Sequence, residues 1–512
     1  QRPCRAATRG RSARDLTIVE ERTVGPSLGA DSIEAGEIAS IISCAIVFAF
    51  LLIAYGQLGL IASIGIAANL ALMVAILSIL GATLTLPGIA GIVLTIGMAV
   101  DSNVIIFERV REERRMGRSI VQSLDSGFKQ ATSTIIDANL TTLIAAVILF
   151  YLGSGPVRGF AVTLAIGIVT TVFTAFTFTR WLIAMWLRRQ RPTEMPAGAV
   201  SYIPFDTKIP FMSMRKFAFG LSIAASLATV AMFMTMNMNL GIDFRGGSLI
   251  EVQAKSGEPD VADVRSRLEE LNLGEVQVQE FGSGELMIRV GTQEGGDAAE
   301  QSVVTKVRGE LEADYEFRRT EVVGPTVSAE LARNGAIGIT AALVAMLIYI
   351  WVRFEWQFAM GAIISTLHDV IMMMGLYVAT GLEFNLTSIA AVLTIVGYSI
   401  NDTVVVYDRM RENLRKYKKM PISELIDISL NQTLSRTILT GLTTIGALVA
   451  LYLFGGEVIS SFTVAMLFGI LVGTYSSLFV AAPLLILFKL RPETFGTEEK
   501  AEGKAPAQVS KA

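Results

Sequence analysis

Eleven long apolar stretches constrain this sequence more than any other feature, because each can cross a lipid bilayer as a helix. A spanning helix needs about 20 mostly apolar residues. Of the 512 residues, 52% are hydrophobic and only 17% are charged, a composition too apolar for an ordinary soluble protein. We expect spans at roughly 37–55, 58–80, 86–107, 132–152, 158–187, 214–236, 335–353, 357–380, 385–407, 433–454 and 459–488.

The distribution of basic residues predicts how these helices are oriented, because cytoplasmic loops collect Lys and Arg. The loops after the third and ninth spans are rich in both, and so is the connection between the fifth and sixth spans. The opposite loops, such as GATLTLPG and TGLEFN, carry no basic residue. The pattern places the N-terminal tail outside and the C-terminus in the cytoplasm.

One segment, residues 240–332, interrupts the apolar pattern on the outer side. Four alternating runs in it read as strands and two amphipathic runs as helices, in the order β-α-β-β-α-β. This order predicts a small α+β domain of ferredoxin-like type. The fold class is therefore an all-α polytopic membrane protein with one α+β insert. An inert spacer is the alternative, but the position just before the second helix set favours a role in transmitting movement.

The two halves of the chain are near copies in sequence. Gly97 maps onto Gly397, and TVGPSLGADSIEAG maps onto VVGPTVSAELARNG with Pro26 on Pro325. Matching segments keep the same direction across the membrane, which is typical of parallel repeats in transporters. The sixth span has no partner in the first half, and the first residue is Gln1 rather than Met. Both features suggest that N-terminal material is missing.

Two aspartates lie inside apolar helices of the repeat. Asp101 lies in GIVLTIGMAVDSNVIIFERVRE and Asp402 in AVLTIVGYSINDTVVVYDRMRE, one position apart in the alignment. A charged side chain in a spanning helix costs roughly 2.5–3.5 kcal/mol on insertion scales, and such residues usually mark a pathway for protons, ions or substrates. We predict that both carboxyls take up and release protons. The alternative is a structural polar contact between packed helices.

Other polar residues surround these acids in the sequence. Arg436 begins the tenth span and is either a counter-ion for one Asp or a side chain that reaches the interface. His368 is a candidate proton relay, or else a hydrogen-bonded histidine between helices. The full set of expected supporting residues is Asn103, Asn401, Thr403, Asp137, Asn139, His368 and Asp369.

Several classes of function are disfavoured by the motifs that the chain lacks. It has one His and no CxxC pattern, so we expect no metal site. It has no P-loop motif, so we expect no ATP hydrolysis. We predict that the protein is not an enzyme and has no cofactor, with protons as the coupling ion and sodium as an alternative.

Three motifs carry a resemblance to a known family. GIDFRGGSLIEV, AVDSNVIIFERVRE, and VGYSINDTVVVYDRMREN followed by LSRTILTGLTT resemble the SecD and SecF proteins of bacterial protein export, within the resistance-nodulation-division superfamily. The resemblance covers about 20–490. The first half is similar to the C-terminal membrane part of SecD and the second half to SecF, in the order of a SecDF fusion.

The resemblance implies a function for the predicted polar site. Proteins of this family are accessories of the Sec translocon that use the proton-motive force to promote late preprotein translocation across the inner membrane. Asp101, Asp402 and Arg436 match the positions that the family uses for proton transport. The implied partners are the SecYEG translocon, YajC-like or YidC-like accessory proteins, unfolded preprotein and the lipid bilayer, with no nucleic acid.

The resemblance also implies a domain organisation with one departure from the family. In the family, the SecD first helix and a large periplasmic domain precede the position of Arg22, and we expect this sequence to lack both. The expected parts are a tail at 1–36 left from a SecD periplasmic region, a SecD-like half at 37–190, a cytoplasmic linker at 191–213, a first SecF-like helix at 214–239, the periplasmic domain at 240–332, a SecF-like half at 333–490 and a disordered cytoplasmic tail at 491–512.

Two other functions stay open at this point. One is a proton antiporter of the same superfamily that exports lipids or small hydrophobic molecules. The other is a structural scaffold that assembles the translocon. The single insert of about 90 residues argues against the antiporter, since the resemblance to the superfamily implies larger paired domains outside the membrane in such exporters.

Overall fold

The computed structural model describes residues 19–192, 198, 207–281, 284–293 and 296–490. Contacts divide the chain into two compact units. One comprises Gln1–Gly29 with Leu240–Ala332, and the other Ala30–Asn239 with Arg333–Ala512. The expected tail at 491–512, the first 18 residues and much of the expected linker at 191–213 lie outside the described residues.

The membrane unit is built from helices that match the predicted spans. In the described part, eleven helices are long and apolar enough to cross a bilayer, as the sequence predicted. Two of them contain a π-helical segment, η1 (Thr174–Thr179) and η4 (Ser477–Ala481). The helices are α1 (Pro26–Tyr55), α2 (Gln57–Ile79), α3 (Leu86–Arg115), α4 (Ile120–Leu152), α5 (Gly155–Phe173) with α6 (Arg180–Gln190), α7 (Arg215–Thr235), α11 (Pro325–Arg353), α12 (Trp356–Thr380), α13 (Leu386–Lys416), α14 (Ile422–Phe454), and α15 (Ser460–Ser476) with α16 (Ala482–Leu487).

Capping residues determine where the two Asp-bearing helices begin. The Thr85 hydroxyl accepts a hydrogen bond from the backbone N–H of Gly88 at the start of α3. Asn385 and Ser388 form a reciprocal capping box at the start of α13. Both caps satisfy backbone N–H groups that a helix start leaves unpaired. They fix the start of each helix, and so the depth of Asp101 and Asp402.

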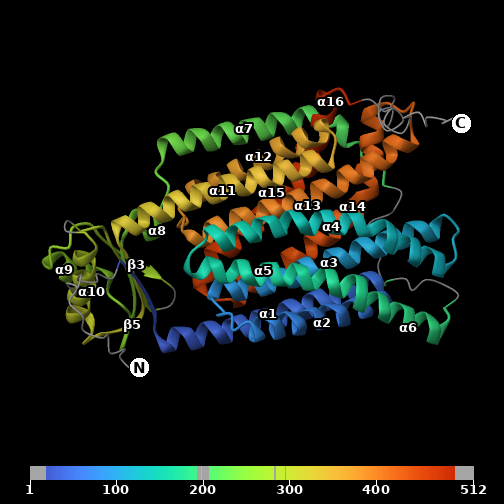
Figure 1. Ribbon diagram of the computed structural model, residues 1–512. Helices are drawn as coiled ribbons and strands as arrows, with labels where there is room; N and C mark the ends of the chain where they lie inside the picture. Colours follow the sequence, from blue (N-terminus) through green and yellow to red (C-terminus); the bar gives the residue numbers. More distant parts are fainter. Residues whose placement is uncertain (1–18, 193–197, 199–206, 282–283, 294–295, 491–512) are drawn as a thin grey trace, which may run out of the picture. The chain divides into compact units, whose positions relative to one another are not determined.

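Four helices form the centre of the membrane unit: α3, α4, α13 and α14. In the apolar window of α3, 94% of residues are buried, compared with 17% in α7. Figure 1 shows α3, α4, α13 and α14 packed together, and α3 contacts α14 as α13 contacts α4. The two contacts are related by the repeat. A Cβ on Gly97 would lie 3.2 Å from Cα of Thr444, and a Cβ on Gly397 would lie 3.2 Å from Cα of Thr142.

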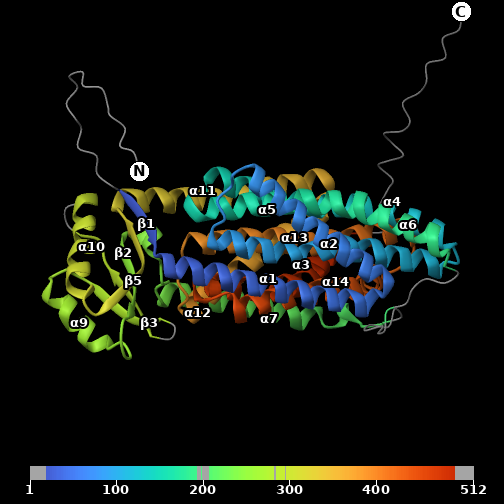
Figure 2. The same cartoon turned by 90° about the horizontal axis from the view of Figure 1, so that it is seen from below.

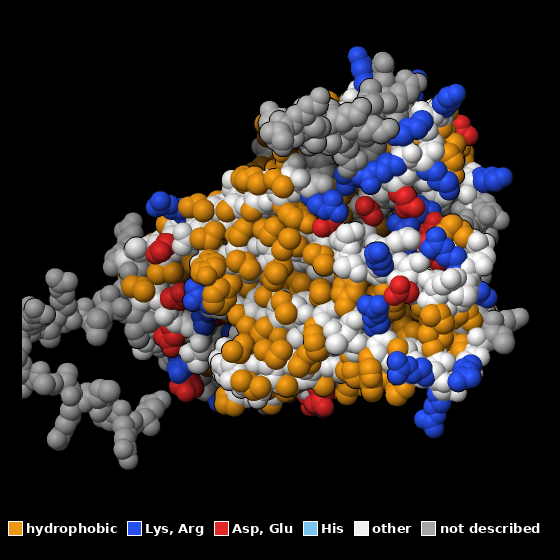
Figure 3. All heavy atoms as spheres, turned by 45° about the vertical axis from the view of Figure 1, so that its right-hand side comes forward, with side chains coloured by type: hydrophobic (Ala, Val, Ile, Leu, Met, Phe, Trp, Pro, Cys, Tyr) orange, Lys and Arg blue, Asp and Glu red, His pale blue; other side chains and the backbone are white. Residues whose placement is uncertain are grey.

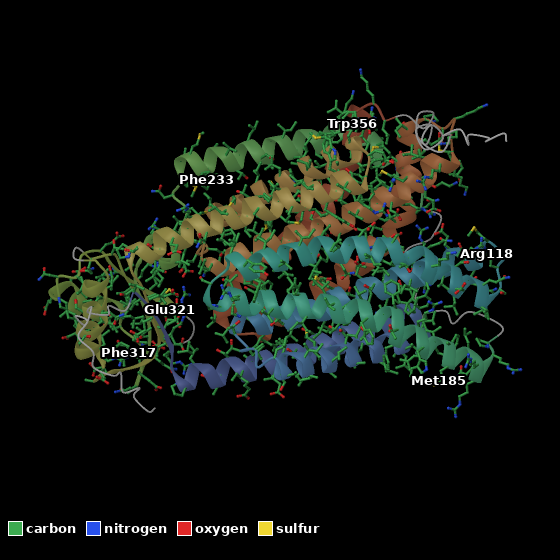
Figure 4. The ribbon with its side chains drawn as sticks, viewed as in Figure 1. Arg118, Met185, Phe233, Phe317, Glu321 and Trp356 are labelled. Atoms are coloured by element: carbon green, nitrogen blue, oxygen red, sulfur yellow. The ribbon has the colours of Figure 1, made fainter. Side chains whose placement is uncertain are left out.

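The surface of the membrane unit separates apolar and basic residues. Figure 3 shows hydrophobic side chains over the middle of the helices and Lys and Arg side chains gathered at one end. Arg118 and Trp356 lie toward that end in Figure 4, whereas Phe233 on α7 lies toward the other. A broad apolar surface bounded by basic residues is typical of a protein that spans a bilayer.

The second unit contains an antiparallel sheet of five strands. The strands are β1 (Glu20–Val24), β2 (Gly247–Ala254), β3 (Val276–Phe281), β4 (Glu285–Val290) and β5 (Tyr315–Val323), in the order β1-β5-β2-β4-β3. Figure 2 shows α9 (Val261–Glu270) and α10 (Asp297–Leu311) on one side of the sheet. Their apolar residues form one core with β2, β3, β4 and β5. A short helix, α8 (Ile242–Arg245), precedes β2.

The sheet has one strand more than the sequence predicted. Strands β2 to β5 and the two helices follow the expected β-α-β-β-α-β order. β1 comes from the segment expected to be a tail at 1–36, whose described part instead supplies this strand and the first turns of α1. β1 pairs with β5 with Arg22 opposite Glu321. These two residues are also equivalent in the repeat, so this strand pair has its own pseudo-two-fold relation.

The face of the sheet away from α9 and α10 carries a row of charged residues. Arg22 contacts Asp243 at 2.6 Å and Glu321 at 3.8 Å. Arg319 contacts Glu321 at 2.9 Å and Glu251 at 3.0 Å. Burial raises the pKa of Glu251, and the Arg319 guanidinium offsets part of that shift. The row therefore includes a buried carboxylate whose charge costs stability.

Candidate functional site: a buried ion pair between the two halves

The centre of the membrane unit holds an ion pair that joins the two repeats. Asp101 on α3 accepts a hydrogen bond from Nη2 of Arg436 on α14, with 3.0 Å between the atoms. Its other carboxylate oxygen accepts from the Asn401 amide on α13 at 2.9 Å. Asp101 is 8% exposed and Arg436 is 6% exposed. The counter-ion interpretation of Arg436 is therefore the one that fits the geometry, since the guanidinium is buried.

Asp402 lies beside this pair but has different partners. Its carboxylate oxygens accept hydrogen bonds from the Thr437 hydroxyl at 2.8 Å and the Ser477 hydroxyl at 2.7 Å. Thr437 follows Arg436 on α14, and Ser477 is the first residue of η4. π-Helical turns occur often at functional sites. Asp402 is 9% exposed, so its carboxyl is held by neutral hydroxyls in a largely dry environment.

Arg436 is only partly satisfied in this arrangement. Its Nε and Nη1 atoms are buried and make no hydrogen bond to the described residues. A buried guanidinium with unused donors is costly unless a charge partner compensates it. Arg436 also acts electrostatically on Asp402. The site can therefore hold one cation between two acids, and the charge state of either acid changes which one the cation favours.

A second acidic cluster lies close to Asp402. Asp369 on α12 accepts hydrogen bonds from the hydroxyls of Ser399 on α13 and Ser476 on α15, the latter at 2.8 Å. The His368 ring nitrogen Nδ1 lies 3.1 Å from Asp369. Both predicted residues, His368 and Asp369, are buried.

The other predicted supporting residues lie apart from the ion pair or bond within their own helix. Asp137 contacts Tyr349 at 2.8 Å and Arg353 at 2.7 Å, both on α11. The Asn103 and Asn139 amides donate to backbone carbonyls four residues earlier, of Ala99 and Ile135. Thr403 is buried next to Asp402 in sequence.

Sequence reasoning did not find the hydroxyl groups that hold the acids. Ser477, Thr437, Ser399 and Ser476 are small residues in apolar helices, where they are common and carry no distinctive pattern. Arg353 as the partner of Asp137 was also not predicted. Only Thr437 had a local signal, because it adjoins Arg436 in the repeated motif.

A second ionic contact joins the halves where α3 and α13 continue beyond their apolar parts. Arg109 contacts Glu412 at 3.0 Å and Glu112 at 3.1 Å, while Arg409 contacts Glu112 and, at 2.9 Å, Glu412. Arg109 and Arg409 are equivalent in the repeat, as are Glu112 and Glu412. The four residues, here called the Arg–Glu ring, thus form a reciprocal contact around the pseudo-two-fold axis.

The fold and the site define a class of protein: a polytopic membrane protein of two parallel repeats with a buried ion pair between them. Among the described residues, no group of three or more His, Cys, Asp or Glu is placed to hold a metal ion. The family described as protein export membrane protein SecD/SecF, C-terminal, matches residues 5–190 and 303–491, and the SecD/SecF GG motif matches 234–258.

Known relatives agree with this match. The chain is 51% identical over 478 residues to protein translocase subunit SecDF of Brucella abortus, covering 93% of this chain and 63% of the relative. It is 36% identical over 497 residues to SecDF of Bacillus subtilis, covering 93% and 67%. The crystal structure of SecDF from Thermus thermophilus, described as a translocon-associated membrane protein, superposes with a TM-score of 0.85 at 38% identity, covering 92% of this chain and 64% of that one.

These comparisons establish the family. The chain belongs to the SecD/SecF family of protein export membrane proteins, as the sequence predicted. It spans 63–67% of the length of the curated SecDF relatives that it matches. The family consists of export membrane proteins, which agrees with the expectation of a protein that is not an enzyme.

Proposed function

We propose that this chain uses proton movement across the bacterial inner membrane to assist protein export through the Sec translocon. The observation that carries the proposal is the buried contact of Arg436 with Asp101, with Asp402 bonded to the next residue of α14, Thr437. Charged groups at such depth are costly and are usually functional. Its relatives are translocase subunits and a translocon-associated protein, which supports the export role.

Protonation of the acids would switch the position of the cation. When a proton neutralises Asp101, the attraction that holds Arg436 to it falls, and the guanidinium, two of whose nitrogens lack partners, turns toward ionised Asp402. Release of the proton reverses the move. Because Asp101 and Arg436 lie on helices of different halves, the switch changes how the halves pack.

The membrane potential is large enough to drive such a change. Moving one elementary charge across the membrane changes its free energy by about 2.3 kcal/mol per 100 mV of potential. This is comparable with the free-energy difference of a few kcal/mol between two conformations of a protein. In the chain, the β-sheet unit is joined to spanning helices on both sides. We therefore propose that it moves when the two halves of the membrane unit move, and that it acts on preprotein outside the membrane.

The proposal includes the arrangement in the membrane. The end rich in Lys and Arg faces the cytoplasm, where the C-terminus also lies, and the β-sheet unit lies outside. The partners that we propose are the SecYEG channel, YajC-like or YidC-like accessory proteins and an unfolded preprotein. The coupling ion is the proton, and no further cofactor takes part.

Preprotein export into membrane vesicles tests the proposal. Asp402→Asn and Asp101→Asn should abolish the stimulation of export by a proton gradient while leaving the ATP-driven part intact. Asp125→Asn is the matched control, because Asp125 is exposed and pairs with Arg180, which is also exposed. Asp125→Asn should export like the unmodified chain. Full stimulation in the Asp402→Asn variant would contradict the proposal.

A further inference from the structure

The Asp369 cluster is linked to Asp402 through one helix. Ser476, which donates to Asp369, is the last residue of α15, and Ser477, which donates to Asp402, is the first residue of η4. Two carboxylates on two different helices are thus held by consecutive hydroxyls. α12, α13 and α15 all contact one another, as Figure 1 illustrates.

A second hydroxyl forms a hydrogen bond between Asp369 and the helix that carries Asp402. Ser399, the other donor to Asp369, lies three residues before Asp402 on α13. At about 1.5 Å per residue the two positions are one turn apart along the helix axis. Asp369 is 1% exposed, and its one titratable hydrogen-bond partner among the described residues is His368. A carboxyl in this setting can alternate between a protonated and an ionised form.

The first half of the chain contains a neutral counterpart of this cluster. Asn69 on α2 is the repeat equivalent of Asp369, and its amide donates to the Thr171 hydroxyl on α5 at 3.0 Å. At this position the first half therefore joins its helices through an amide and a hydroxyl. The packing of the repeat does not need an acid at this position, so the carboxyl of Asp369 needs another explanation.

We propose that Asp369 is an additional proton-carrying residue, which exchanges protons with Asp402 through the hydroxyls of Ser476 and Ser477. The inference rests on the proposed function. Protonated Asp369 gives its proton to the Ser476 hydroxyl oxygen while Ser476 passes its own proton to the Ser477 hydroxyl oxygen, and Ser477 passes its own proton to ionised Asp402. Each serine gains one proton and loses one, so both end neutral. One proton leaves Asp369 and one arrives at Asp402, with no other reactant.

The position of Ser399 on α13 indicates the side from which Asp369 is supplied. Ser399 is nearer than Asp402 to Leu386, the start of α13, which faces outside in the proposed arrangement. The His368 ring lies 6.4 Å from the Tyr475 ring, and the Tyr475 hydroxyl contacts Ser222 on α7 at 3.0 Å. These contacts lead to the half of α7 nearer Arg215, so the outer entry rests on the position of Ser399. Asp369 would accept protons from the outer side and pass them to Asp402.

Proton flux into liposomes that contain the purified chain tests this inference, with a pH-sensitive dye inside and an imposed pH gradient. Asp369→Asn should slow the flux by roughly a hundredfold, the low end of what a lost proton-transfer group costs. Asp369→Glu, which restores a carboxyl, should recover part of the flux. The double variant Ser476→Ala/Ser477→Ala keeps both acids and should also slow it. Asn69→Ala removes the equivalent interhelical bond of the first half and should leave the flux unchanged.

The Asp402→Asn variant separates the two proposals in the same assay. If it blocks flux while Asp369→Asn or the double serine variant conducts at the unmodified rate, the relay is wrong and the proposed function stands. If Asp402→Asn itself conducts normally, the proposed function is wrong. If Asp369→Glu is as slow as Asp369→Asn although both fold, the residue is structural and the relay is overturned.

Discussion

Arg436 and Asp101 are the pair on which the interpretation of the site depends most. The repeat provides Thr134 where the second half has Arg436, and Asn401 where the first half has Asp101. The pair is therefore an asymmetric feature in a symmetric framework. One buried cation shared by two acids that differ in their partners can favour one acid at a time, which symmetric pairs could not do.

Removing only the cation should destabilise the membrane unit more than removing the whole pair. Arg436→Ala leaves the Asp101 charge buried, and breaking one side of a buried ion pair costs about 3–5 kcal/mol. The double variant Arg436→Ala/Asp101→Asn should recover much of this loss. The thermal unfolding midpoint in detergent measures both, with Arg180→Ala as the control because its partner Asp125 is exposed. A double variant no more stable than Arg436→Ala would show that the buried charge is not what costs stability.

Glu251 predicts a pH dependence in the β-sheet unit. Its pKa in the fold is raised by burial, so as the pH rises the unfolded chain ionises first, near pH 4.3 for an ordinary Glu. The contribution of Glu251 to the free energy of unfolding is therefore complete below that pH. It is lost as the pH rises through the folded pKa, by about 1.4 kcal/mol per unit of pKa shift. Glu251→Gln removes the titration, so its stability relative to the unmodified chain should rise through this interval.

Hydrogen exchange of the amides in β2 and β5, in the full chain at matched pH values, measures this difference. Comparison of the variant with the unmodified chain at each pH removes the intrinsic pH dependence of exchange. A difference in protection that stays constant across the interval would contradict the assigned cause.

At the scale of helices, the close contacts of Gly97 and Gly397 set the distance between the halves. A methyl group at either position would press on the backbone of a threonine in the opposite half. Gly97→Ala and Gly397→Ala should each destabilise the protein by about 1–3 kcal/mol, as overpacking does. Gly441→Ala on α14 meets nothing within 4 Å and is the matched control. Equal unfolding midpoints for all three variants would show that these crossings are not tightly packed.

The Arg–Glu ring predicts a measurable coupling between α3 and α13. A double-mutant cycle on Arg409 and Glu112 should give a coupling energy above the 0.2–1 kcal/mol of exposed pairs, because the Arg409 side chain is only 7% exposed. The cycle on Arg109 and Glu412 should give less, since the Glu412 side chain is 49% exposed. Equal coupling in the two cycles would mean that burial does not govern this contact.

For the whole molecule, the fold was largely predictable because the bilayer imposes a length on each helix. The apolar runs gave the number of spans, and the alternating runs gave the strands of the insert. β1 was not predicted, because five residues with mixed polarity, EERTV, form a strand only by pairing with β5. Pairing between segments about 300 residues apart leaves no local pattern.

Only the charged and amide residues of the candidate site could be identified from the sequence. Asp101 contacts Arg436 and Asn401, and Asp402 bonds to Thr437, the residue after Arg436. The sequence singled out the acids, Arg436 and Asn401 because charged or amide groups stand out in apolar helices, and their part in proton movement stays a prediction. Asp137 was expected as a supporting residue, and it pairs with Arg353 on α11, a partner that the sequence did not indicate. The serines and the threonine that donate to Asp369 and Asp402 could not be predicted, because only the packing of the helices determines which hydroxyls reach the two acids.

The central claim is that the buried carboxyls change protonation. Infrared difference spectra of the chain in lipid, recorded as the pH is varied, measure this through the stretching band of protonated carboxyls. We expect a band that grows as the pH falls through the physiological range, that loses one component in Asp402→Asn and another in Asp101→Asn, and that is unchanged in Asp125→Asn. If the spectra show both acids ionised throughout that range, with no component lost in either variant, the account is contradicted.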